Sequence, residues 1–181
     1  MKETVLRIRI FGDPALRRKS VSVNRITVRH RDILSKMSQL MYEDSGIGLA
    51  APQVGINECM IVADIGEGLF KLINPRVVKK EGSQALEEGC LSVPGVCIKV
   101  KRAKKVLVAA QDESGKPVKI EAQGLFACVL QHEIDHLKGK LIVDYAGVLN
   151  KMKIAARLKK LKELSKHELS EPEAKSCKLQ L

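Results

Sequence analysis

His132-Glu133-Ile134-Asp135-His136 is the stretch that decides how this chain is interpreted. In a helix, side chains four positions apart lie on one face, one turn above the other. Both imidazoles can then bind one metal ion, and Glu133 can reach a water molecule on that metal. The pattern indicates a metal-dependent hydrolase. The rest of the chain has to supply a third ligand and a substrate cleft.

The two histidines continue the apolar face of a predicted helix over residues 124–138. Leu125 and Val129 precede His132 and His136 at positions i, i+4, i+7 and i+11. The alternative is a helix with an exposed polar face. Burial of three titratable side chains costs free energy unless they are paired or coordinated, and this helix is otherwise apolar. We therefore prefer the metal site.

Strands are predicted on both sides of this helix. Alternating or apolar runs bounded by turn residues indicate strands at 4–11, 60–63, 69–74, 96–100, 105–110, 118–122 and 141–143. Amphipathic periodicity predicts further helices near the two ends, at 28–44 and 151–167. This order favours an α+β fold, with antiparallel strands packed around a central motif-bearing helix and with an N-terminal helix and a C-terminal helix.

The length of 181 residues suits one domain. We expect a single catalytic domain over 1–166 and a flexible charged tail over 167–181. No stretch approaches the roughly 20 apolar residues that span a bilayer, so no membrane association is expected. The five cysteines have irregular spacing and no signal peptide opens the chain. These features predict a reduced, cytoplasmic protein with free thiols. No transit peptide is visible, so we favour a bacterial cytoplasm.

The net charge of +11 favours contact with polyanions, chiefly nucleic acid, although a solvated basic surface explains it equally well. Aromatic residues are only 3% of the chain and tryptophan is absent, which argues against base stacking. The predicted C-terminal helix carries many of the cations, at Lys151, Lys153, Arg157, Lys159, Lys160 and Lys162.

The third metal ligand does not follow the second histidine. A downstream metalloprotease pattern needs a histidine where this chain has Ile142. The other candidates lie in stretches that read as basic, exposed or solvated, and they are His30, His167, Glu163 and Glu168.

Cys90 is the better candidate. It lies in the extended segment 87–94, flanked by glycine and leucine and closed by a proline. A thiolate with two imidazoles suits Zn(II), Fe(II) or Ni(II). Cys128 is the rival, because it lies about one helical turn before His132. It more simply packs as a small apolar residue.

A glycine-rich run, Gly46-Ile47-Gly48-Leu49-Ala50-Ala51-Pro52-Gln53, follows the early helix. No Gly-Lys-Ser/Thr follows it, so it is not a phosphate loop. Small residues let another peptide backbone come close. Gln53 is the one polar side chain among them, and a water-exposed tight turn remains an equal interpretation of the run alone.

Three segments together resemble the signatures of the peptide deformylase family, in the expected order. They are Gly46–Gln53, Glu88-Gly89-Cys90-Leu91-Ser92 and Gln131-His132-Glu133-Ile134-Asp135-His136-Leu137. The resemblance covers roughly residues 4–165. It implies an α+β hydrolase that removes the N-formyl group from the formyl-methionine of nascent polypeptides and releases formate.

The resemblance also implies a site. Cys90, His132 and His136 would bind one divalent metal, Fe(II) in the cell, with Zn(II), Ni(II) or Co(II) as substitutes. Glu133 would carry the proton, and Gln53 with the Leu91 N–H would bind the oxyanion. The substrate would contact Gly46, Ile47, Gly48, Gly89, Leu125 and Val129. N-formylmethionyl nascent peptides are the implied partners, and the ribosome is a further one through the C-terminal helix. A metal-dependent endopeptidase and an RNA-binding module with a structural metal are the rival functions.

Overall fold

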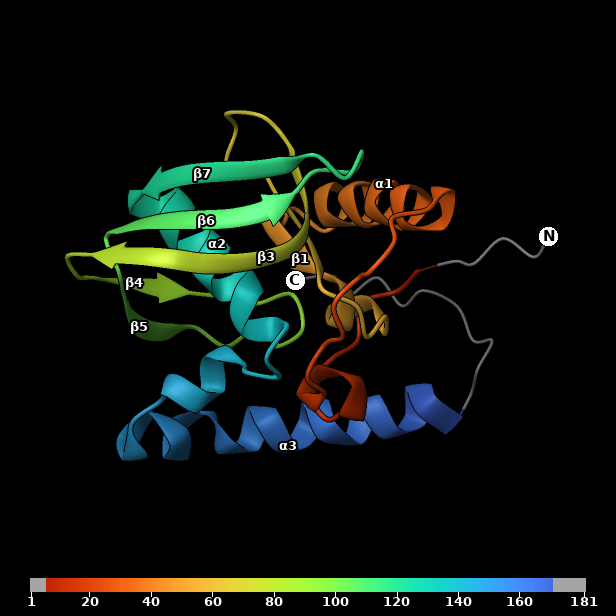
Figure 1. The fold of residues 1–181 in the computed structure, drawn as a ribbon. Helices are drawn as coiled ribbons and strands as arrows, with labels where there is room; N and C mark the ends of the chain where they lie inside the picture. The colour runs from red at the N-terminus through yellow and green to blue at the C-terminus, as the bar shows by residue number, and fades with distance from the viewer. Residues whose placement is uncertain (1–5, 171–181) are drawn as a thin grey trace.

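The computed structural model describes residues 6–170 of the chain (Figure 1). Three α-helices, seven strands and three short 3-10 helices (η) make up this part. In chain order they are η1 (Pro14–Arg17), α1 (Val28–Glu43), β1 (Gly48–Ala50), η2 (Ala51–Val54), β2 (Met60–Ala63), β3 (Phe70–Glu81), β4 (Gln84–Glu88), β5 (Ile98–Arg102), β6 (Lys105–Gln111), β7 (Pro117–Gln123), α2 (Gly124–His136), η3 (Ile142–Tyr145) and α3 (Val148–Ser170).

The strands form two antiparallel sheets. The larger sheet has the order β1-β2-β3-β6-β7, which makes β1 and β7 its edge strands. The smaller sheet pairs β4 with β5 only, from Gln84 opposite Arg102 to Glu88 opposite Ile98. No ladder among the described residues joins the two sheets. Their relative position therefore depends on side chains and on α2.

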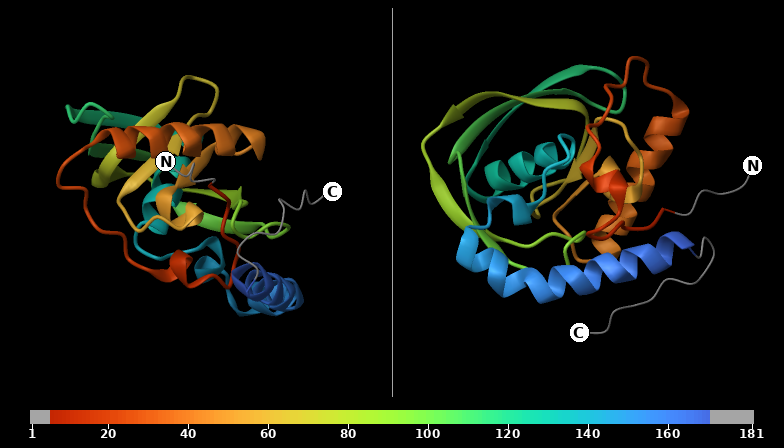
Figure 2. Two further views of the ribbon diagram at one scale, coloured as in Figure 1. Left: turned by 90° about the vertical axis from the view of Figure 1, so that its right-hand side faces the viewer. Right: turned by 90° about the horizontal axis from the view of Figure 1, so that it is seen from below.

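Helix α2 is the central element of the core. Its apolar face, with Ala127, Leu130 and Ile134, packs against Ile61 of β2 and Val108 of β6. The curved strands wrap around this helix in the view from below (Figure 2). An α+β fold with antiparallel strands around the motif-bearing helix is therefore confirmed.

The terminal helices cover other parts of the strands. Helix α1 packs Leu34, Met37 and Met41 against β1 and β2. Helix α3 lies across the bottom of the molecule (Figure 1), where Leu161 joins a third apolar cluster with η1, β5 and η3. No helix of the described residues is long and apolar enough to cross a membrane.

Several predicted strands differ from the structure. Residues 6–10 join no ladder, and 141–143 lie largely in η3 rather than in a strand. Strand β3 does not end at Pro75, because a register shift between Ile73 and Arg76 lets the chain pass the proline without a ladder bond there. The short strands β1 and β4 were not predicted, since three to five residues carry too little periodicity.

His30 is buried rather than exposed. Its Nδ1 accepts a hydrogen bond from the Thr27 backbone N–H at 2.9 Å, which caps the start of α1. Near the other end of the chain, α3 extends to Ser170. Residues 171–181 of the expected tail lie outside the described residues.

Candidate metal and active site

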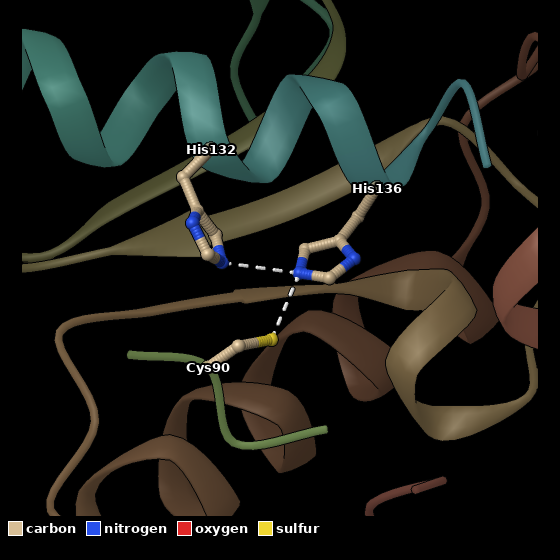
Figure 3. Close-up of side chains that lie close together, drawn as sticks. All are labelled: Cys90, His132 and His136. Atoms are coloured by element: carbon tan, nitrogen blue, oxygen red, sulfur yellow. Dashed lines mark hydrogen bonds between the residues drawn. The ribbon is translucent and has the colours of Figure 1, made fainter. Parts of the chain in front are cut away.

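Cys90, His132 and His136 bring three donor atoms together (Figure 3). The two histidines project from one face of α2, and Cys90 follows the end of β4. The Cys90 Sγ lies 3.3 Å from the His136 Nε2, which lies 3.1 Å from the His132 Nε2. Within residues 6–170 this is the one such group whose donor atoms all lie within 4.8 Å of one another.

These distances fit one tetrahedral cation. With Zn–N near 2.0–2.1 Å and Zn–S near 2.3 Å, tetrahedral angles place two nitrogens about 3.3 Å apart and sulfur about 3.6 Å from nitrogen. The observed edges are slightly shorter. The donor set is the soft thiolate-and-imidazole type that binds Zn(II), Fe(II), Ni(II) and Co(II). The residues present therefore fit a single divalent metal.

The electrostatics of the site also favour a cation. Burial lowers the pKa of His132, but the facing Cys90 sulfur and Glu88 carboxylate outweigh it and raise that pKa to about 10. The same negative charge that favours a proton favours a metal ion. His136 is 1% exposed, and burial together with the charge of His132 lowers its pKa well below the usual value. Its ring is neutral, as a ligand must be.

Glu88 orients His132. The His132 Nδ1 lies 2.9 Å from a Glu88 oxygen, so Nε2 is the ring nitrogen that faces the other donors. Burial raises the pKa of Glu88, but His132 and Arg102 outweigh it and hold that pKa below its usual range. Arg102 binds both Glu88 oxygens and also donates to Asp135 at 2.9 Å.

Glu133 lies beside the donors and is 3% exposed. Burial raises its pKa to about 7, although the charges of His132 and Arg102 act in the opposite direction. The Glu133 Oε2 has no hydrogen-bond partner among the described residues. A carboxyl group with a pKa near neutrality and an unpaired oxygen is suited to proton transfer.

Gln53 is 1% exposed, and its side chain is held in a defined orientation. Its Oε1 accepts a hydrogen bond from the Ala50 N–H at 2.8 Å, so its amide Nε2 faces the Cys90 Sγ at 3.6 Å and the Ser92 hydroxyl at 3.2 Å. An exposed turn residue, the alternative interpretation, is excluded by this burial. A buried amide donor beside the Cys90 sulfur can bind a developing negative charge.

A cavity of about 470 Å³ opens next to these groups. Its walls include every residue that the sequence associated with substrate binding, namely Gly46, Ile47, Gly48, Gly89, Leu125 and Val129. Gln53, Leu91, Glu133, Cys90 and His132 line it as well. All the sequence-predicted site residues other than His136, which lies deeper, therefore border one cavity.

Sequence reasoning missed the charged groups behind the donors. Arg102, Asp135 and Tyr145 form a connected set, in which the Tyr145 hydroxyl donates to Asp135 at 2.6 Å. The one signal in the sequence that could have pointed to them is Arg102, a charged residue at a buried position of the alternating strand β5. Cys128, the rival ligand, lines the cavity but accepts a hydrogen bond from the Gln84 amide at 3.2 Å and is outside the donor group.

Comparison with known proteins shows which family the chain resembles. The family model described as polypeptide deformylase matches residues 5–152. A peptide deformylase from Halothermothrix orenii is 50% identical over 142 residues, which are 77% of this chain and 92% of that protein.

Solved structures agree in fold. A peptide deformylase from Legionella pneumophila superposes with a TM-score of 0.83 at 39% identity, covering 90% of this chain and 98% of the other. One from Synechococcus elongatus, in complex with actinonin, gives 0.78 at 38% identity, covering 92% and 88%. The chain belongs to the polypeptide deformylase family and is a hydrolase.

Proposed function

We propose that this enzyme removes the formyl group from N-formylmethionyl nascent peptides by metal-dependent hydrolysis, releasing formate. The convergence of Cys90, His132 and His136 beside the buried Glu133 is the observation that supports this reaction most directly. A divalent cation held by the three donors would supply Lewis acidity at the formyl carbonyl and acidify the attacking water.

The protein's own groups move the proton and bind the charge. Glu133 accepts a proton from the attacking water and later gives it to the departing amine nitrogen, so that formate and a free amino terminus result. The Gln53 amide Nε2 and the Leu91 N–H donate to the formyl oxygen as it becomes negative. Their fixed positions mean that little reorganisation is needed during the reaction.

The substrate backbone would lie along β1. This strand is at the edge of the larger sheet, and Gly48 lines the cavity. An extended peptide can add to such an edge by main-chain hydrogen bonds. Across the cavity, Gly89 follows β4 and lets the peptide come close, since no atom lies within 4 Å of the place where its Cβ would be. The methionine side chain would enter between Leu125 and Val129.

The test of the reaction compares wild type with Glu133→Gln, using formyl-Met-Ala-Ser and a blocked peptide with only internal amide bonds. Wild type should release formate from the first substrate alone. The variant should keep its metal content and lose about 10²–10⁴-fold in kcat, the usual contribution of a positioned acid–base group. Cleavage of the internal bonds would favour an endopeptidase, and unchanged kcat in Glu133→Gln would exclude its role as proton carrier.

We propose Fe(II) as the metal in the cell, with Zn(II), Ni(II) or Co(II) able to replace it. The thiolate of Cys90 and the ferrous ion are both open to oxidation. Protein purified without oxygen should contain about one iron per chain, and its activity should decay in air faster than that of Ni(II)-loaded protein. Equal decay with every metal would contradict ferrous iron as the sensitive component.

We also propose that the enzyme acts in the bacterial cytoplasm and that the basic face of α3 docks on the ribosome. Lys153, Lys159 and Lys160 are exposed on α3. Arg157 does not belong to this face, because its Nε donates to the Pro94 carbonyl at 2.9 Å. Deletion of α3 would expose the core around Leu161, so glutamine substitution of the three exposed lysines is the sharper test. Salt-sensitive co-sedimentation with ribosomes should be lost in that variant and kept in a variant of distant lysines.

A further inference from the structure

A second cavity, of about 360 Å³, lies on the far side of the Glu88–Arg102 ion pair from the catalytic cavity. Glu88 borders the first cavity and Arg102 borders the second. The walls of the second come from the end of β3, from β5, from the last turns of α2 and from η3, which lie together in Figure 1. No residue that lines this second cavity takes part in the deformylation steps proposed above.

The second cavity carries unpaired positive charge. Lys80, Lys101 and Lys138 line it and are exposed. Within residues 6–170, the lysines that form ion pairs with carboxylates are Lys36, Lys71 and Lys79. None of the three cavity lysines is therefore neutralised by a described carboxylate. The remaining charges of the lining, Arg102 and Asp135, are bonded to each other. Three free ammonium groups therefore face one hollow.

We propose that this cavity binds the phosphate backbone of structured RNA. Lysine ammonium groups on flexible stems act as solvated point charges, which suits the repeated phosphates of a backbone. Among the described residues, Tyr145 is the one aromatic side chain in the lining. Its hydroxyl donates to Asp135, and its ring faces the Arg102 guanidinium at 5.3 Å. The lining therefore offers neither a free aromatic ring for base stacking nor a free arginine to read base edges. Binding through lysine–phosphate contacts alone should be independent of RNA sequence and sensitive to salt.

The RNA in question is that of the ribosome, and this choice rests on the proposed action on nascent chains. The site is distinct from the exposed face of α3. It would add phosphate contacts from β3, β5 and the turn that follows α2. Lys80 and Lys101 are held on strands of the core, and Lys138 lies two residues beyond the end of α2. Two separate basic surfaces would fix the orientation of the enzyme on a duplex, whereas one would fix only its proximity.

The test measures binding of a fluorescein-labelled, mixed-sequence RNA duplex by anisotropy at several salt concentrations. The cavity variant carries Lys80→Gln, Lys101→Gln and Lys138→Gln. The matched control carries Lys19→Gln, Lys116→Gln and Lys119→Gln, which are exposed lysines away from the cavity. Both variants lose three positive charges, so a difference between them reports position rather than net charge.

The cavity variant should bind the duplex at least tenfold more weakly at about 0.1 M salt, with the salt slope reduced by about two to three, since each lost phosphate contact removes about 0.9. The control should keep most of the slope. Equal losses in both variants would overturn the site, and so would displacement of the duplex by millimolar ATP, which would indicate a mononucleotide site. Hydrolysis of formyl-Met-Ala-Ser should be unchanged in the cavity variant, so failure of the RNA site is distinguishable from failure of the deformylase reaction.

Discussion

At the scale of single residues, Gly48 is a position where the absence of a side chain makes room for a neighbouring group. A Cβ at this position would overlap the Glu133 carboxylate, so strand β1 and this buried side chain occupy adjoining space. The sequence showed a glycine in a loop of small residues, which was interpreted as room for a substrate backbone. The structure adds a second reason, because the same glycine makes room for a buried acid.

Gly48→Ala should therefore lower activity more than stability. Displacing Glu133 by a few tenths of an ångström or more should reduce kcat/KM by about 10–100-fold, while overpacking should lower the unfolding free energy by about 1–3 kcal/mol. Formate release and urea denaturation measure the two effects. Gly147→Ala, where nothing lies within 4 Å of the added Cβ, is the control. Wild-type kinetics in Gly48→Ala would show that Glu133 tolerates the shift.

Glu88→Gln should weaken metal binding without removing a ligand. The amide carries no charge to balance His132 and Arg102, and loss of such a partner behind a metal-bound histidine costs about 10–100-fold in affinity. Competition with a chelator of known affinity measures it. The neighbouring Glu87→Gln is the control, because Glu87 is exposed and makes no ion pair among the described residues. Equal affinities in the two variants would contradict the orienting role of Glu88.

At the scale of elements, η1 and η3 are joined by a short ionic contact. Arg17 donates to both Asp144 oxygens at 2.6 and 3.0 Å, and the Leu141 N–H donates to Asp144 at 2.9 Å. Partial burial raises the pKa of Asp144, but these donors outweigh it and hold the pKa below its usual range. A pKa that is lower in the folded than in the unfolded protein stabilises the fold above the unfolded value, near pH 4.

Asp144→Asn should lower the unfolding free energy by about 1 kcal/mol at pH 7, because the pair is partly exposed and screened by water. The difference from wild type should shrink as the pH falls from about 4 through the folded pKa, where the wild-type carboxylate also becomes neutral. Urea denaturation at pH 7 and near pH 3 measures this. A difference that grew on acidification would reverse the proposed sign.

The elements that sequence could predict are the long periodic ones. Helices α1 and α2 and the hairpin of β6 and β7 follow clear apolar spacing and turn residues. Pro75 misled the prediction because a bulge beside Asn74, whose φ is +53°, carries β3 past it. The donor residues were predictable from motifs, whereas Arg102 and Asp135 became part of the site only through a contact 33 positions apart.

At the scale of the whole molecule, the metal donors come from two separate parts of the core. Cys90 follows β4 of the smaller sheet, and the histidines come from the helix inside the larger one. A bound ion therefore stabilises the arrangement of the two layers as well as the site. Binding to the folded state alone adds about 4 kcal/mol at a free metal concentration 1,000 times the dissociation constant.

Removal of the metal with a chelator should lower the Tm, and hydrogen exchange should increase most in β4, β5 and the segment that carries Cys90. Amide exchange followed by mass spectrometry measures this, with re-addition of Ni(II) as the control. The edges of the larger sheet, such as β7, should change little. A uniform increase over the whole chain would contradict a local effect of the metal.

Because no ladder within residues 6–170 joins the two sheets, a bound ion would add a removable cross-link between the segment after β4 and helix α2. A molecule that lost its ion would expose a less protected β4–β5 segment to proteases at the same time as it became inactive. Turnover of idle copies could then follow metal supply without any dedicated sensor. Catalytic readiness and lifetime in the cell would share one cause.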